Sequence, residues 1–345
     1  MIFNKNEQNF SNNIAANAPE IDFGATADTT TDTTASATAD RNATATVGET
    51  TNAADNADKS VACVLCPNEC GVNRDLKKGI CGESNKMRIA KYYLHPFEEP
   101  FISGKNGSGT VFFSGCGLKC VFCQNYELSR SKRGKDITPN ELADIFKELE
   151  NAGAHDINLV NPTHFAPQIY EAIKIRRPNI PVVYNSHGYE SERSLDFALK
   201  FSDVFLPDLK YYSPEVSLRY ANCNDYFAVA EKAIKRMMRE RKTVIENDLM
   251  QSGVCVRHLI LPLNLADTRK IIEWFAKNQE NGAFFSLMAQ YTPFGEIDKF
   301  PELKRKITAR EYNAGVEKVF EENIKNCIIQ KRESASECFI PKWDF

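Results

Sequence analysis

Six short apolar runs alternate with amphipathic stretches of helical length, and this alternation constrains the fold more than any other feature of the chain. The runs occupy residues 110–113, 157–160, 181–185, 203–207, 254–261 and 283–288. The stretches that follow them have apolar residues at helical spacing, over 138–153, 165–176, 191–200, 225–241, 267–279 and 308–322. Strands that alternate with helices pair in parallel. We therefore predict an α/β fold, an incomplete parallel (β/α)6 barrel with its active site at the carboxyl ends of the strands.

Three closely spaced cysteines follow the first predicted strand. Cys116, Cys120 and Cys123 have the spacing C-x3-C-x2-C, which lets a short loop bring three thiolates to one soft metal centre. Four thiolates close an ordinary iron–sulfur cluster, so three leave one iron open. A zinc site usually takes four ligands in paired knuckles, and no second knuckle adjoins this triplet. Inert buried cysteines are the remaining alternative.

A second cysteine group lies upstream, with the spacing C-x2-C-x3-C-x10-C. Its members are Cys63, Cys66, Cys70 and Cys81. Four thiolates can close either a tetrahedral zinc site or a second 4Fe–4S cluster, and the spacing leaves both open. A metal-free loop with reduced thiols is the alternative. No export signal is visible among the first residues, and clustered cysteines in a reducing compartment more often bind metal than form disulfides.

Composition divides the chain into four segments. We predict a disordered Ala/Thr-rich tail over 1–60, a Cys-rich metal-binding segment over 61–106, the barrel over 107–325 and a C-terminal extension over 326–345. The net charge of −3 comes from the acidic tail, and the remainder is too mildly basic to favour nucleic acid. No apolar run is long enough to span a membrane. We expect a cytoplasmic monomer with no membrane partner.

With an aromatic residue, Phe122, directly before its last cysteine, the triplet resembles that of the radical S-adenosylmethionine (radical SAM) superfamily. The segments 95–100, 159–164, 206–211 and 257–262 (HPFEEP, LVNPTH, LPDLKY and RHLILP), among others, are similar to uncharacterised homologues of pyruvate formate-lyase activating enzymes. The similarity extends from about residue 63 to about residue 341. It implies a partial barrel of the radical SAM type.

The resemblance also implies an activity. The triplet would hold a 4Fe–4S cluster with S-adenosylmethionine (SAM) at its open iron, and reductive cleavage would give a 5′-deoxyadenosyl radical for hydrogen abstraction. An electron donor such as flavodoxin or ferredoxin and a glycyl-radical protein substrate are the implied partners. The alternatives are a radical SAM enzyme that modifies a small molecule, peptide or RNA, and a non-catalytic iron–sulfur or zinc-binding module.

The resemblance further places cofactor-binding residues at the strand ends. Phe122 would pack beside the adenine, with ordinary core packing as the alternative. At the position of the superfamily's Gly-Gly-Glu motif this chain has Asn-Pro-Thr-His, which gives Asn161, Thr163 and His164 as candidates. Later strand ends add Asn185, Ser186, Asp208 and Lys210, of which Lys210 would meet the methionine carboxylate.

A few further positions have weaker indications. Arg257 and His258 are neighbours within one predicted strand, so one must point inward and the other outward. Gln290 and Tyr291 end the last strand and are expected to line the substrate side. We interpret His95 as structural and assign no role to His155 or His187.

Overall fold

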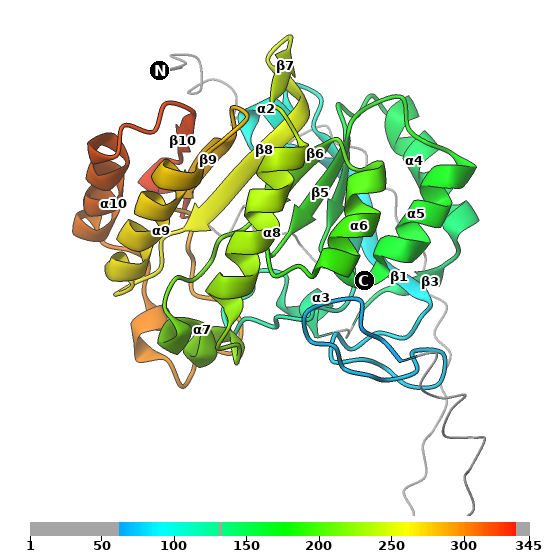
Figure 1. Cartoon of the computed structure of the whole chain (residues 1–345), viewed down its shortest axis with the longest axis horizontal. Helices are drawn as coiled ribbons and strands as arrows, with labels where there is room; N and C mark the ends of the chain where they lie inside the picture. Colours follow the sequence, from blue (N-terminus) through cyan, green and yellow to red (C-terminus); the bar gives the residue numbers. More distant parts are fainter. Residues whose placement is uncertain (1–61, 131–132, 336–345) are drawn as a thin grey trace, which may run out of the picture.

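The computed structural model describes residues 62–130 and 133–335. Its centre is one mostly parallel sheet with the strand order β10-β9-β8-β6-β5-β4-β2-β1-β3 (Figure 1). Within the described residues this path has two ends, β10 and β3, so the sheet is an unclosed barrel. The predicted α/β class is confirmed. The tail over 1–60, for which the sequence predicts disorder, lies outside the described residues.

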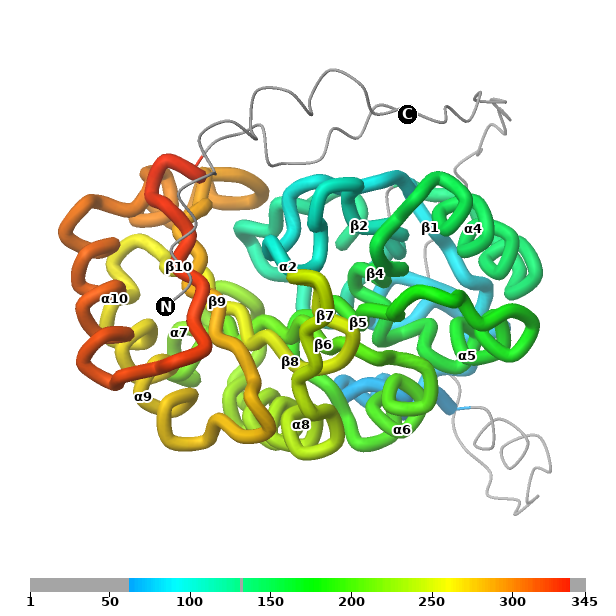
Figure 2. The backbone as a smooth tube through the Cα atoms, turned by 90° about the horizontal axis from the view of Figure 1, so that it is seen from above, coloured from blue at the N-terminus to red at the C-terminus, as the bar shows by residue number. Residues whose placement is uncertain are grey.

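The six predicted strands are all present and pair in parallel with their neighbours. They are β2 (Ser108–Phe113), β4 (Ile157–Val160), β5 (Val182–Ser186), β6 (Val204–Pro207), β8 (Leu249–Leu259) and β9 (Phe284–Met288). The predicted helices are α4 (Pro139–Asn151), α5 (Ala166–Ile175), α6 (Glu192–Phe201), α8 (Tyr226–Glu240), α9 (Leu265–Asn278) and α10 (Ala309–Glu321). Figure 2 shows these helices as an outer arc around the strands.

Local sequence explains where several of these helices begin. Thr138 caps α4 and Thr308 caps α10, each in a capping box with a glutamate three residues later. Ser191 caps α6 in the same way, with Ser194 as its partner. The apolar face of each helix then packs on the sheet, as the fully buried Phe146 of α4 illustrates.

Several elements were not predicted. β1 (Met87–His95) pairs antiparallel with β2, and β3 (Lys135–Ile137) pairs antiparallel with β1. β10 (Cys327–Ile329) adds a parallel strand beyond β9, and β7 (Val244–Glu246) forms a hairpin with β8. The helices α2 (Pro100–Ser103), α3 (Tyr126–Ser129) and α7 (Pro214–Ala221) complete the main elements. The sheet therefore extends into both flanking segments, 61–106 and 326–345.

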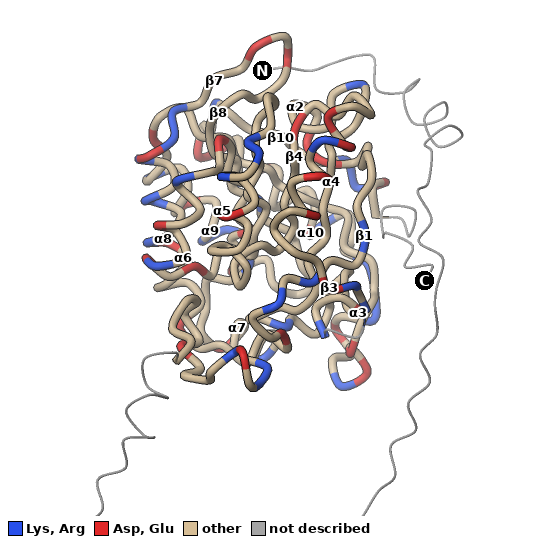
Figure 3. Tube along the Cα trace, turned by 90° about the vertical axis from the view of Figure 1, so that its right-hand side faces the viewer, with Lys and Arg blue, Asp and Glu red and all other residues tan. Residues whose placement is uncertain are grey.

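The carboxyl ends of the parallel strands share one edge of the sheet, because parallel neighbours run in the same direction. The arrows of β5 and β8 in Figure 1 point toward the end of the molecule where α3, α7 and the Cys-rich segment lie. In the described part of the chain, every helix falls short of the length and apolarity that a membrane span needs. Figure 3 shows lysines and arginines interspersed with aspartates and glutamates.

Candidate active site

The three cysteines of the triplet line one cavity at the carboxyl edge of the sheet. The cavity has a volume of about 240 Å³, and its wall includes Cys116, Cys120 and Cys123. The loop that holds them leaves β2 through Gly115, whose φ of 81° lies in the left-handed region that favours glycine. The amide of Leu118 donates to Cys116 Sγ at 3.4 Å. A short glycine-containing turn thus brings the three cysteines to the wall of one cavity.

Electrostatics at the triplet fits a group that carries positive charge. Burial raises the pKa of all three thiols, that of Cys120 to about 12, while the charge of Lys210 opposes the shift. Tyr211 donates its hydroxyl proton to Cys120 Sγ at 3.1 Å. Three buried thiolates together need cations beside them, and the irons of a cluster supply that charge.

A cluster and a single ion place different demands on the thiols. Among residues 62–130 and 133–335, no group of three or more His, Cys, Asp or Glu side chains is arranged to hold a metal ion. A 4Fe–4S cluster spreads its thiolates over separate irons, so the donor set at the triplet fits a cluster with one open iron.

Polar side chains at the ends of β5 and β6 line the same cavity. Asn185 and Ser186 end β5, and Asp208 and Lys210 follow β6. Lys210 Nζ lies 2.5 Å from Asp208 Oδ2. Burial raises the pKa of Asp208, but Arg257 and Lys210 outweigh it and hold the pKa below its usual value. Burial lowers the pKa of Lys210, and the charge of Asp208 more than reverses this. Both groups are therefore charged at neutral pH.

Arg257 connects several polar side chains of the cavity wall. Sequence analysis left open whether Arg257 or His258 points inward. Its guanidinium donates to Asp208 at 2.9 Å, to Glu98 at 3.1 Å and to Asn185 Oδ1 at 2.6 Å. Glu98 comes from the segment after β1 and lines the cavity together with Arg257. The inward member of the Arg-His pair is thus Arg257, while His258 bonds to Leu209 O and Thr268 outside it.

Asn161 lines the cavity and has one unpaired acceptor. It follows β4 with a φ of 59°, a left-handed conformation that asparagine tolerates better than most residues. Its Nδ2 donates to Gly115 O, whereas its buried Oδ1 has no hydrogen-bond partner within the described structure. The amide of Asn161 thus has an unused acceptor next to the cavity that it lines.

Phe122 lies between the cavity and the core. Its ring lines the cavity, and it also makes edge contacts with Tyr211, Tyr220 and Tyr291 at centroid distances of 6.3, 6.0 and 6.0 Å. The aromatic residue before the last cysteine is therefore part of the core that supports the loop and part of the cavity surface.

Two candidates lie outside the lining of this cavity. Thr163 and His164 line a smaller neighbouring pocket, together with Cys66 and Cys81. Thr163 donates to Glu190 at 2.6 Å, and His164 Nε2 lies 2.6 Å from Ser114 O. Burial lowers the pKa of His164 to about 3, so its ring is neutral.

The structure adds residues to the cavity that sequence reasoning did not place there. His95, interpreted as structural, and Phe97 line it, as does His187. Gln290 lines the cavity as expected, but Tyr291 is buried in the core and donates to Leu303 O at 2.7 Å. The sequence signal for His95, Phe97 and Glu98 was their segment HPFEEP, which the resemblance had already singled out.

The upstream cysteines also lie close to one another. A Cβ placed on Gly79 would lie 3.3 Å from Cys70 Sγ and 3.4 Å from Cys81 Sγ. Burial raises the pKa of the Cys66 thiol to about 11, and the nearby thiolates of Cys81 and Cys63 add to the shift. Cys63, Cys66 and Cys70 are free cysteines, as are the three of the triplet.

Comparison with known proteins defines the family. Residues 110–275 match the model of the radical SAM superfamily. The chain is 31% identical over 265 residues to the uncharacterised protein MJ0674 of Methanocaldococcus jannaschii, an alignment that covers 74% of this chain and 73% of that protein. It is 25% identical over 234 residues to the pyruvate formate-lyase-activating enzyme of Clostridium pasteurianum, which covers 64% of this chain and 90% of that one. The chain belongs to the radical SAM superfamily.

Solved structures give more distant matches. Structures of SuiB from Streptococcus suis bound to its precursor peptide SuiA and bound to S-adenosylmethionine each match with a TM-score of 0.45 and 10% identity. Those alignments cover 63% of this chain and span about half of SuiB, 46% and 48%. A domain of the pyruvate-formate lyase-activating enzyme from Bacteroides vulgatus matches with a TM-score of 0.33 and 14% identity, over 56% of this chain and 91% of that domain.

Proposed function

We propose that this protein cleaves S-adenosylmethionine reductively at a 4Fe–4S cluster held by Cys116, Cys120 and Cys123. The observation that carries the proposal is the convergence of these three thiols with polar strand-end residues on one cavity. When bound, the cluster and SAM supply a 5′-deoxyadenosyl radical that abstracts hydrogen from a substrate. Membership of the superfamily supports this chemistry.

The chain's own residues would bind and orient SAM. Asn161 lines the cavity, and its Oδ1, which lacks a donor in the described structure, is the acceptor proposed for the methionine amine. Lys210 Nζ can donate three hydrogen bonds and makes one of them to Asp208. The others remain for the methionine carboxylate. Asn185 and Ser186 are within the same wall and serve the ribose or the carboxylate. Phe122 and the aromatic side chains behind it offer an apolar surface for the adenine.

The proposed partners follow from the similarity to a pyruvate formate-lyase-activating enzyme. A flavodoxin- or ferredoxin-type protein would supply one electron per cleavage. The proposed substrate is a glycine Cα–H of a glycyl-radical protein. The exposed ring of Phe97 in the cavity lining gives such a protein an apolar contact point.

The cleavage reaction can be tested with one cysteine variant. Full-length protein, reconstituted with iron and sulfide without oxygen, is expected to form 5′-deoxyadenosine when given dithionite and SAM. Cys120→Ala should lower the rate by at least about 100-fold, because two thiolates no longer secure a cluster. Chromatographic assay of 5′-deoxyadenosine is the measurement.

Cys327→Ala is the matched control, because Cys327 lies on β10 and is absent from the cavity lining. It should retain wild-type activity. Full activity in Cys120→Ala would contradict the proposal. The activating-enzyme reaction is then tested separately by incubation with pyruvate formate-lyase, where a glycyl-radical signal in electron paramagnetic resonance (EPR) is expected. Cleavage of SAM without that signal would support the proposed cleavage reaction and exclude pyruvate formate-lyase as the substrate.

A further inference from the structure

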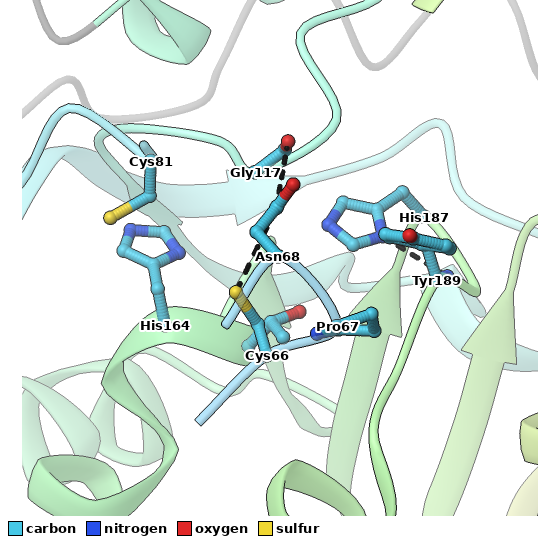
Figure 4. A pocket seen from close by; sticks show the side chains of 9 residues that line it. Cys66, Pro67, Asn68, Cys81, Gly117, His164, His187 and Tyr189 are labelled. Atoms are coloured by element: carbon cyan, nitrogen blue, oxygen red, sulfur yellow. Dashed lines mark hydrogen bonds between the residues drawn. The ribbon is translucent and has the colours of Figure 1, made fainter. Parts of the chain in front are cut away.

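The Cys-rich segment is hydrogen-bonded directly to the loop that carries the triplet. The amide of Cys116 donates to the carbonyl oxygen of Cys81 at 2.9 Å. One residue further along the loop, Gly117 O accepts from Asn68 Nδ2 at 3.1 Å. The same Asn68 Nδ2 lies 3.8 Å from Cys66 Sγ, and Figure 4 shows it between the two partners. Residues of the two cysteine groups thus share hydrogen bonds.

Two glycines of the triplet loop permit this close approach. A Cβ on Gly115 would lie 2.8 Å from Cys81 O, a distance that real Cβ atoms do not adopt. A Cβ on Gly117 would lie 2.8 Å from Asn68 Nδ2 and 4.0 Å from Cys66 Sγ. The loop therefore leaves space for the second cysteine group as well as for its own turn.

The backbone of the Cys-rich segment turns its cysteines toward each other. Cys63 N donates to Val72 O at 2.9 Å, and Gly71 N returns a bond to Cys63 O at 3.0 Å. A second turn, closed by Gly79 N and Glu83 O at 3.0 Å, carries Cys81. Gly79 lies between the sulfurs of Cys70 and Cys81, where a side chain would fill the space.

A buried cation lies in the segment that carries the four thiols. Arg74 is only 6% exposed, and its guanidinium donates to His164 O and Ser84 O, each at 2.5 Å. Its Nε has no hydrogen-bond partner within the described structure. Carbonyl oxygens do not neutralise a buried guanidinium, so a negative group is expected next to it. The same His164 lines a small pocket together with Cys66 and Cys81, so the guanidinium is held at the edge of the cysteine group.

We propose that Cys63, Cys66, Cys70 and Cys81 hold a second 4Fe–4S cluster, which relays an electron to the cluster of the triplet through the contact between Cys81 and Cys116. One electron leaves a reduced flavodoxin- or ferredoxin-type donor, enters the second cluster and passes on to the first. The donor is oxidised by one electron, the second cluster returns to its starting state, and no bond forms or breaks. The proposed relay rests on the proposed function, because it needs the cluster of the triplet as its electron acceptor. The presence of the second cluster does not depend on that function.

Metal analysis tests the second cluster independently of catalysis. Wild-type protein reconstituted without oxygen should contain about eight irons per chain, and the double variant Cys116→Ala/Cys120→Ala should keep about four. Cys66→Ala/Cys81→Ala should also hold about four, whereas the control Cys327→Ala should match wild type. Iron and zinc are measured together by mass spectrometry. A folded triplet variant that contains zinc, or no metal, would overturn the proposal.

EPR spectroscopy of the wild type answers the same question without a variant. After reduction by dithionite, two cluster signals are expected, and SAM should alter only one of them, because a cluster with four thiolates has no open iron. A single signal that responds completely to SAM would overturn the second cluster. Two signals without 5′-deoxyadenosine would leave the second cluster in place while the proposed function fails.

The relay is tested by comparing two reductants in Cys66→Ala/Cys81→Ala. Dithionite is small and reaches either cluster, whereas a flavodoxin must dock. The ratio of flavodoxin-driven to dithionite-driven 5′-deoxyadenosine formation should fall at least tenfold relative to wild type. An unchanged ratio would show that the second centre is structural and would overturn the relay.

Discussion

Arg257 joins two parts of the chain that are far apart in sequence. Glu98 follows β1 and Asp208 follows β6, and the guanidinium contacts both, with Glu99 at 3.9 Å behind them. Its side chain is 12% exposed, so these charges are largely removed from water. Burial raises the pKa values of Glu98 and Glu99, and Arg257 opposes the shift. Glu98 and Glu99 therefore depend on Arg257, whereas Asp208 also pairs with Lys210.

Replacing this cation should be costly. Arg257→Met keeps much of the apolar volume but leaves buried carboxylates without their partner, and we expect it to lower the free energy of unfolding by about 3–5 kcal/mol. Urea unfolding at pH 7 followed by circular dichroism is the measurement. The pKa values of Glu98 and Glu99 are already raised by burial, and without Arg257 they should rise further. Lowering the pH below 7 should therefore stabilise the variant more than it stabilises the wild type.

Arg236→Met is the matched control. Arg236 pairs with Glu192 and Asp196, whose side chains are 72% and 60% exposed, so its loss should change stability by no more than about 1 kcal/mol. Equal effects of the two substitutions would contradict the importance assigned to the buried network.

Single residues differ in how far sequence identified them. The three cysteines of the triplet could be picked out as candidate ligands because they are close in the chain and their spacing is informative. The Arg257–Glu98 contact was not, since its partners are 159 residues apart and only the fold brings them together. Thr163 and His164 occupy a strand end, as expected, yet a short 3₁₀ turn, Thr163–Phe165, buries both of them in the neighbouring pocket.

At the scale of elements, the capping box of α10 is reinforced by an arginine. Glu311 accepts from Thr308 N at 2.7 Å and from Leu263 N at 2.7 Å, and Arg305 binds both of its carboxylate oxygens at 2.8 Å. The hydrogen bonds from Arg305 lower the pKa of Glu311 to about 2, against an opposing effect of burial. The carboxylate thus ties α10 to the loop after β8.

We expect Glu311→Gln to reduce the free energy of unfolding at pH 7 by about 1–3 kcal/mol, the range for hydrogen bonds to a charged group. The folded pKa is depressed, so the stabilisation is present above the unfolded pKa and is lost as pH falls from about 4.5 toward 2. The difference between wild type and variant in urea unfolding should therefore be constant from pH 7 to 5 and smaller at pH 4.

Glu141→Gln provides the comparison, because Glu141 makes the same capping box in α4 but is exposed. Its effect should not exceed about 1 kcal/mol. If Glu311→Gln were equally mild and showed no pH dependence, Arg305 would have no stabilising role.

Elements were predictable where apolar periodicity was strong. The six parallel strands and their helices follow from buried runs and from amphipathic stretches such as 139–151. β1 was missed because it lies in the segment 61–106, which was interpreted from its cysteines, glycines and prolines as a metal-binding segment. Its pairing with β2 depends on tertiary contact, as does that of the three-residue β10 with β9. Short edge strands have little periodicity of their own, so sequence alone does not reveal them.

For the whole molecule, the described fold accounts for the site without residues 1–58. The sheet begins at β1, and the first cysteine of the upstream group is Cys63. A chain that begins at residue 59 should therefore keep its unfolding midpoint within about 2 °C, a shift that corresponds to less than about 1 kcal/mol. Differential scanning calorimetry and the 5′-deoxyadenosine assay are the measurements. A clearly lower midpoint or loss of activity would show that the tail contributes to the fold or the site.

The loop that carries Arg74 has another consequence, concerning how the protein matures. Between Ala62 and Lys86 the chain forms no helix or strand beyond one isolated bridge, so its shape depends on hydrogen bonds of turns rather than on regular secondary structure. If the four thiolates bind a cluster as proposed, insertion of that cluster and folding of the loop become one event. In a cell short of iron, the barrel would be folded while the Cys-rich loop that contacts the triplet was not yet in place. Newly made chains would then wait, folded but not functional, for the delivery of metal.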